Sequence, residues 1–115
     1  MQVDNWQRIE KEQLNPLYTR HVIHSDTMTV VRVHFKKGCE VAEHSHPNEQ
    51  VSMVEQGALK FVMGGMEQVV RPGGVVRIAP NLLHSVQAIE DCVMVEVFSP
   101  RRQDWIDAAD ANLRK

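Results

Sequence analysis

The feature that most constrains the fold is a series of short segments in which apolar and polar residues alternate, each closed by turn-forming residues. In TVVRVHF, residues 29–35, Val31, Val33 and Phe35 fall on one side and Arg32 and His34 on the other. Successive side chains of a β-strand point to opposite faces, so a segment of this kind is predicted to be a strand with one buried face.

Two later segments repeat the pattern. In GALKFVM, residues 57–63, the apolar residues at 59, 61 and 63 face away from Lys60. In CVMVEVF, residues 92–98, Met94, Glu96 and Phe98 share a face opposite three valines. Turn residues separate such segments, and Gly64-Gly65 suits a tight type I′ hairpin because glycine tolerates positive φ. Many short strands at this spacing predict an all-β sandwich or barrel.

The two ends of the chain differ from this middle. We expect one domain over residues 1–115, with an N-terminal arm at about 1–18, a barrel at about 19–99 and a C-terminal helix at about 103–113. The tail DWIDAADANLRK favours a helix with Asp104 as its N-cap. Its apolar stripe would be formed by Ile106, Ala109 and Leu113.

Composition excludes several classes of partner. The 115 residues, 43% of them apolar, can bury one core. Thirteen basic and fifteen acidic residues give a net charge of -2 without a basic stripe, so nucleic acid is not expected as a partner. No apolar run approaches the ~20 residues that cross a bilayer, and no signal peptide is evident, which favours a cytoplasmic protein. Cys39 and Cys92 are expected to be buried thiols.

The stretch HSHPNEQ, residues 44–50, carries candidate metal ligands. His44 and His46 are two residues apart, so on an extended segment both imidazoles project from one face and can reach one ion. In the strand that follows, Glu49 and Gln50 must point to opposite sides, and Gln50 shares its side with polar Ser52. Taken alone, the two histidines leave metal binding and an ordinary hydrogen-bonding role equally open.

The other histidines divide into two groups. His84 follows the Pro80-Asn81 turn at the start of a predicted strand, and it is a further candidate ligand because a jelly roll brings distant strands together. His21, His24 and His34 are expected to be surface or hydrogen-bonded residues.

The stretch GCEVAEHSHPNEQVSMVEQG resembles the first motif of the cupin family. Four of its residues are in register with that motif, namely Gly38, His44, His46 and Gly57, and Gln50 occupies the position of the family glutamate. A second motif is matched in spacing by Gly73 and His84, but Ala79, Asn81 and Ala88 replace its usual proline, glycine and asparagine. The resemblance covers about residues 28–98.

This resemblance implies a cupin-type jelly-roll β-barrel with a short C-terminal helix. It also implies one divalent transition metal ion, whether Zn, Ni, Fe, Mn or Co, held by His44, His46, Gln50 and His84.

A narrower resemblance involves VEVFSPRRQDWI, residues 95–106, together with the HSHPNEQ loop. Both look like the single-domain cupins of pectin and alginate breakdown, which convert a cyclic 4,5-unsaturated uronate monosaccharide into its linear keto form. The D-x-F-S-P-x-R segment of that family falls on Glu96, Phe98 and Arg102, which the resemblance marks as catalytic residues, with Glu96 in place of aspartate. It implies a small anionic sugar acid, a uronate, as the substrate.

The neutral ligand set favours one kind of chemistry. Three imidazoles and one amide leave the +2 charge of a divalent ion uncompensated, so the ion would be a stronger Lewis acid and would attract an anionic substrate. The same set makes a higher oxidation state harder to reach. We therefore expect an isomerising or ring-opening enzyme, with a cupin dioxygenase and a non-catalytic small-ligand-binding cupin as the alternatives.

The strand pattern also bears on oligomeric state. If Gln50 faces the interior, Val51 and Met53 face outward, and outward apolar residues need a cover. We expect the N-terminal arm or a second subunit to provide it, most simply in a two-fold homodimer.

Overall fold

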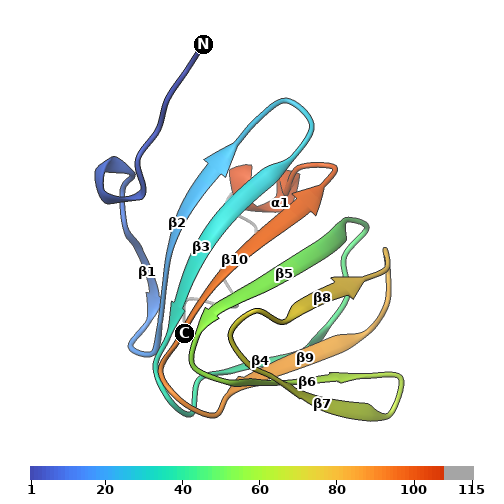
Figure 1. Cartoon of the computed structure of the whole chain (residues 1–115). Coiled ribbons are helices and arrows are strands. Elements are labelled where there is room, and N and C mark those ends of the chain that lie inside the picture. Colours follow the sequence, from blue (N-terminus) through green and yellow to red (C-terminus); the bar gives the residue numbers. More distant parts are fainter. Residues whose placement is uncertain (108–115) are drawn as a thin grey trace.

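The computed structural model describes residues 1–107, which fold into two β-sheets that face each other (Figure 1). The six-stranded sheet has the order β1-β2-β3-β10-β5-β8 and the four-stranded sheet the order β4-β9-β6-β7. All strand pairs recorded for this part of the chain are antiparallel. Several neighbours, such as β3 and β10 or β4 and β9, are distant in sequence, as expected for a jelly roll. The predicted jelly-roll fold is therefore confirmed.

The strands divide unequally between the two sheets. The six-stranded sheet comprises β1 (Glu12–Asn15), β2 (Tyr18–His24), β3 (Thr29–Phe35), β5 (Glu49–Gln56), β8 (Val75–Ile78) and β10 (Cys92–Ser99). The four-stranded sheet comprises β4 (Glu40–His44), β6 (Leu59–Met63), β7 (Met66–Val70) and β9 (His84–Ala88). A 3-10 helix, η1 (Trp6–Arg8), precedes β1, and the helix α1 (Gln103–Ile106) follows β10.

The core lies between the sheets, where the alternating segments turn their apolar faces. On β3 the side chains of Val31, Val33 and Phe35 are buried, while Arg32 and His34 on the other face are only partly covered. On β10 the buried face is formed by Met94, Glu96 and Phe98. The predicted alternation is therefore correct on both strands, and it places a carboxyl group inside the barrel.

The predicted glycine hairpin is also confirmed. Gly64 and Gly65 have φ of 57° and 76°, and they join β6 to β7 at the paired residues Met63 and Met66. Both thiols are free and buried, as expected for Cys39 and Cys92.

The ends of the chain depart from the predictions in detail. β1 lies within the segment expected to be an arm and pairs with β2. The predicted N-cap is wrong, because α1 is preceded by Arg102 and the Asp104 carboxylate instead accepts hydrogen bonds from the Arg102 guanidinium.

The prediction that Ile106 lies on the buried face of the helix is also wrong. Trp105 is buried with 9% of its surface exposed, whereas Ile106 is 41% exposed. The described helix ends at Ile106, and Ala109 and Leu113 lie outside the described residues. No helix within residues 1–107 has the length and apolar character needed to cross a membrane.

Gly57, which joins β5 to β6, provides a test of packing at this end of the barrel. It has φ of 79°, and a Cβ built there would lie 2.2 Å from the Asp91 carbonyl oxygen and 2.9 Å from Cys92 Sγ. We expect Gly57→Ala to lower the free energy of unfolding in urea by about 3 kcal/mol or more. Gly38→Ala is the matched control, since Gly38 has φ of 87° with nothing within 4 Å. Equal losses of unfolding free energy in the two variants would show that the close contact at position 57 does not affect stability.

Candidate metal centre

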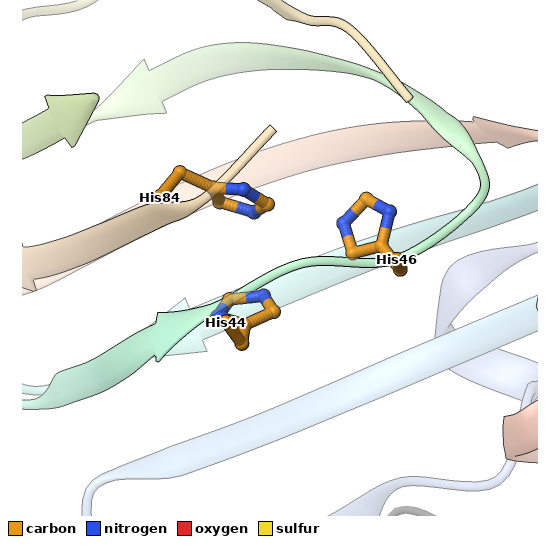
Figure 2. A group of neighbouring side chains, drawn as sticks. All are labelled: His44, His46 and His84. Carbon is orange, nitrogen blue, oxygen red and sulfur yellow. The ribbon is translucent and has the colours of Figure 1, made fainter. Parts of the chain in front are cut away.

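Three histidines from two parts of the sequence meet between the two sheets (Figure 2). His44 ends β4, His84 begins β9, and the two residues are direct partners across this antiparallel pair. His46 lies in the loop after β4. Each residue offers one ring nitrogen, and these nitrogens all lie within 4.8 Å of one another. The three histidines are therefore positioned to hold one metal ion.

The backbone fixes the orientation of each ring. The Nδ1 atoms of His44, His46 and His84 lie 2.8, 3.0 and 2.8 Å from the carbonyl oxygens of residues 42, 48 and 82 respectively. A carbonyl oxygen can only accept, so each Nδ1 carries the proton and each neutral ring presents the Nε2 lone pair. His84 Nε2 is buried and has no hydrogen-bond partner among residues 1–107, as expected of a ligand atom whose partner would be a cation.

Burial keeps these rings in the form that binds metals. It lowers the pKa of His84 to about 4. Burial, followed by the nearby Arg102 charge, also lowers the pKa of His46. A histidine must be neutral to coordinate a metal ion, so both rings are ready to do so at neutral pH.

Gln50 meets the same site from β5. Its side chain is buried and Glu49 is exposed, so the predicted strand parity is correct. Gln50 Oε1 lies 2.9 Å from His46 Nε2. With the ring proton on Nδ1, this contact brings two lone pairs together, and a metal ion bound to both atoms would make it favourable. The donors present therefore fit a divalent transition metal with nitrogen and oxygen ligands.

The loop that carries His46 is held by two asparagines. The Asn48 side chain donates to the carbonyl oxygens of Pro100 and Arg101 at 2.6 and 3.1 Å, and the Asn48 backbone carbonyl oxygen accepts a hydrogen bond from His46 Nδ1. Asn81 donates its backbone N–H to the His46 carbonyl at 2.8 Å and has φ of 65°. Asparagine tolerates this conformation, which explains how it can replace the usual glycine of the second motif.

This backbone requirement leads to a prediction at position 81. Asn81→Gly should leave the free energy of unfolding within about 0.5 kcal/mol, whereas Asn81→Ala should lower it by about 1 kcal/mol, because alanine is strained at positive φ. Urea unfolding of the two variants measures the difference. Equal stability of the glycine and alanine variants would contradict a role for the left-handed backbone here.

The residues that the resemblance marked as catalytic lie in the same cavity as His44 and His84. Glu96, Phe98 and Arg102 line it together with His44, Gln50 and His84. The Phe98 ring is 5.5 Å from the His46 ring and 5.2 Å from the Trp105 ring, edge to face in both cases. β10 therefore carries its acid and its aromatic residue to the candidate metal centre, an arrangement that strand parity allows.

Arg102 is held in place by its neighbours. Its Cζ lies 4.8 Å from the centre of the Phe98 ring and 4.4 Å from that of Trp105. Nε and Nη2 donate to the two carboxylate oxygens of Asp104 at 3.0 and 2.7 Å, and these bonds hold the pKa of Asp104 below its usual value. The guanidinium is thus fixed at the cavity with one edge already paired.

Several residues of this region were not singled out from the sequence. Trp105 and Tyr18 also line the cavity, and the buried Arg20 places its Cζ 3.9 Å from the centre of the Trp105 ring. Arg20 also forms a 3.4 Å ion pair with Glu12. The available signal was the alternation on β2, which puts residues 18, 20 and 22 on one face.

The remaining histidines lie outside the cluster. His21 Nδ1 contacts the Ile9 carbonyl oxygen at 3.0 Å, and His24 Nδ1 contacts Thr29 Oγ1 at 2.8 Å, so the hydrogen-bonded role predicted for both is confirmed. His34 lies on the outward face of β3, with its ring 6.1 Å from that of His21.

Comparison with known proteins agrees with this architecture. The family model for the cupin domain matches residues 31–98. The pectin degradation protein KdgF of Dickeya dadantii (strain 3937) is 31% identical over 84 residues, which cover 71% of this chain and 76% of that protein.

Two solved structures share the fold. The structure of KdgF from Halomonas sp. superposes with a TM-score of 0.81 at 26% identity, covering 86% of this chain and 94% of that one. An RmlC-like cupin from Shewanella frigidimarina NCIMB 400 gives a TM-score of 0.84 at 24% identity, covering 89% and 93%. The fold, the motif spacing and the family match lead to one conclusion: the chain belongs to the cupin domain family.

Proposed function

We propose that this cupin is a metal-dependent enzyme that converts a cyclic 4,5-unsaturated uronate into its linear keto form. The observation that carries the proposal is that the three-histidine cluster and Gln50 lie beside the Glu96 carboxyl and the Arg102 guanidinium. His44, His84 and Gln50 share one cavity with Glu96 and Arg102. The similarity to two proteins named KdgF, one of them called a pectin degradation protein, supports a uronate as the substrate.

We assign the metal ligands to His44, His46, Gln50 and His84. Their donor atoms are neutral and turned toward one another, and the hydrogen bonds at Nδ1 keep the rings from rotating. A bound divalent ion would supply Lewis acidity at a substrate oxygen, which stabilises negative charge as a ring opens or an enol becomes a ketone.

Glu96 is our candidate for moving the proton. Both hydrogen bonds that the structure gives its carboxyl group, from Gln50 and from Ser52, end on Oε2. We assign Oε1 to the substrate, since Glu96 lines the cavity. Burial raises the pKa of Glu96, and a raised pKa suits a group that both gives and takes a proton near neutral pH.

Arg102 is our candidate for recognising the uronate carboxylate. Asp104 occupies the edge formed by Nε and Nη2, so a substrate carboxylate would be received at the Nη1 side. Stacking on Phe98 and Trp105 fixes the plane of the guanidinium, and a fixed planar donor can select a carboxylate by geometry.

The direct test is an absorbance assay for loss of the 4,5 double bond, using metal-loaded protein and the unsaturated uronate monosaccharide. We expect loss of absorbance that requires metal, with no oxygen consumed in a parallel electrode measurement. Oxygen uptake coupled to turnover would instead indicate the dioxygenase. Ligand-dependent thermal stabilisation without turnover of any uronate would indicate a binding protein.

We also propose a homodimer built on the outer face of the six-stranded sheet. Val95 pairs across the strands with Met53, and Val97 pairs with Val51, giving a half-buried apolar patch on that face. Light scattering at micromolar concentration should give twice the chain mass, and Val97→Lys should reduce it to the mass of one chain. A monomeric wild-type protein would contradict the proposal.

A further inference from the structure

Three buried polar side chains on β5 and β10 form a closed hydrogen-bonded group behind the candidate metal centre. Gln50, Ser52 and Glu96 have 5%, 0% and 6% of their surfaces exposed. Gln50 Nε2 donates to Ser52 Oγ at 2.9 Å and also to Glu96 Oε2. Ser52 Oγ donates to the same carboxylate oxygen at 2.8 Å.

This arrangement determines which way the Gln50 amide faces. Its oxygen and nitrogen have nearly the same shape, so packing alone hardly distinguishes the two orientations. The Glu96 carboxylate only accepts, and it therefore requires the Gln50 NH₂ group. Rotating the amide by half a turn would set Oε1 against the carboxylate and lose both of the bonds that Nε2 donates. The observed orientation turns Oε1 to within 2.9 Å of His46 Nε2.

The strand register explains why glutamate suits this position. Glu96 is the direct partner of Ser52 across β10 and β5, whereas the direct partner of Gln50 is Phe98. The residue 96 carboxyl group must therefore reach diagonally, two residues along β5, to meet the Gln50 amide. Long side chains can span such a diagonal. An aspartate would be one methylene shorter.

We propose that Glu96, assisted by Ser52, is a positioning residue that holds the Gln50 carbonyl oxygen as a metal ligand. The proposal rests on the metal site of the proposed function but not on the identity of the substrate. Residues that orient metal ligands by hydrogen bonds usually contribute to metal affinity, even though they never touch the ion.

A double-mutant cycle on metal affinity tests this role without using enzyme activity. Zn²⁺ dissociation constants would be measured by competition with a chelator dye for the wild type, Glu96→Gln, Gln50→Ala and the double variant. A glutamine at 96 can donate as well as accept, so it no longer selects one amide orientation. We expect Glu96→Gln to weaken binding by about 10-fold or more in the wild-type background. In the Gln50→Ala background its effect should nearly vanish.

Glu96→Asp separates the effect of side-chain length from the effect of the carboxylate charge. It keeps the carboxylate but shortens it, so we expect it to weaken binding as Glu96→Gln does and to change the Co²⁺ absorption spectrum. Circular dichroism of the metal-free variants checks the fold, and Ser52→Ala, which removes one of the bonds to Glu96, serves if Glu96→Gln does not fold.

The outcomes are distinct. Full affinity in both Glu96 variants, or an equal loss with and without Gln50, would overturn the positioning role and leave the proposed function standing. A wild-type protein that binds no metal would overturn both.

Discussion

Replacing His84 with alanine is expected to weaken binding of Zn²⁺ or Co²⁺ by more than about 100-fold, beyond the usual effect of residues that only orient ligands. His84 joins His44 across β4 and β9, and its buried Nε2 has no hydrogen-bond partner in the structure. Removing the ring would leave two imidazoles and an amide, too few to close a four-ligand site. Isothermal titration or chelator competition measures the change.

His34→Ala is the matched control for His84→Ala. It removes the same kind of side chain from the outward face of β3, away from the cluster. Its metal affinity should equal that of the wild type. Full affinity in His84→Ala, or an equal loss in His34→Ala, would show that the bound ion is not held by the cluster in Figure 2.

The second large effect is expected on turnover. With metal at saturating concentration, Glu96→Gln should lower kcat for the unsaturated uronate by about 10²–10⁴-fold, the usual loss when a general acid or base is removed. Saturating metal compensates for any loss of affinity, so the remaining defect reports proton transfer. The absorbance assay described above supplies kcat and KM.

Glu49→Gln is the control for this substitution. It makes the same chemical change next to Gln50, but on the exposed face of β5. We expect it to retain wild-type kcat. If Glu96→Gln at full metal occupancy also keeps wild-type kcat, the proton must be moved by another group.

The strand pattern was readable from the sequence because its cause is local. Alternation on β3 and β10 depends only on the two-residue period of an extended chain, and the apolar inward face of β3 was predicted correctly. On β10 the alternation was predicted, but the choice of inward face required the fold. The same period decided between Glu49 and Gln50. The HxH spacing and the position of His84 were also informative. They belong to the two family motifs, and His44 ends β4 while His84 begins β9.

The parts that were missed depend on contacts between distant residues. No sequence pattern predicted the bonds of Asn48 to the chain after β10, and only the fold shows them. In the terminal helix the buried residue is Trp105 and not Ile106, because the direction in which α1 meets the barrel is set by Phe98 and Arg20. Local helical periodicity carries no information about that direction.

The charge balance of the site also differs from what the ligand types alone suggested. Three imidazoles and an amide carry no negative charge, but the Glu96 carboxyl group is hydrogen-bonded directly to Gln50. When ionised, Glu96 places a negative charge in direct contact with the Gln50 side chain. Arg102 adds a positive charge at the cavity. The ligand set remains neutral, and the field around it depends on the protonation of Glu96.

Anomalous diffraction from crystals of the Zn²⁺-loaded protein tests the central claim most directly. We predict one strong peak per chain inside the barrel, with the Nε2 atoms of His44, His46 and His84 and the Oε1 atom of Gln50 at about 2.0–2.2 Å from the ion. No peak between these four side chains, or a peak held by other residues, would contradict the account.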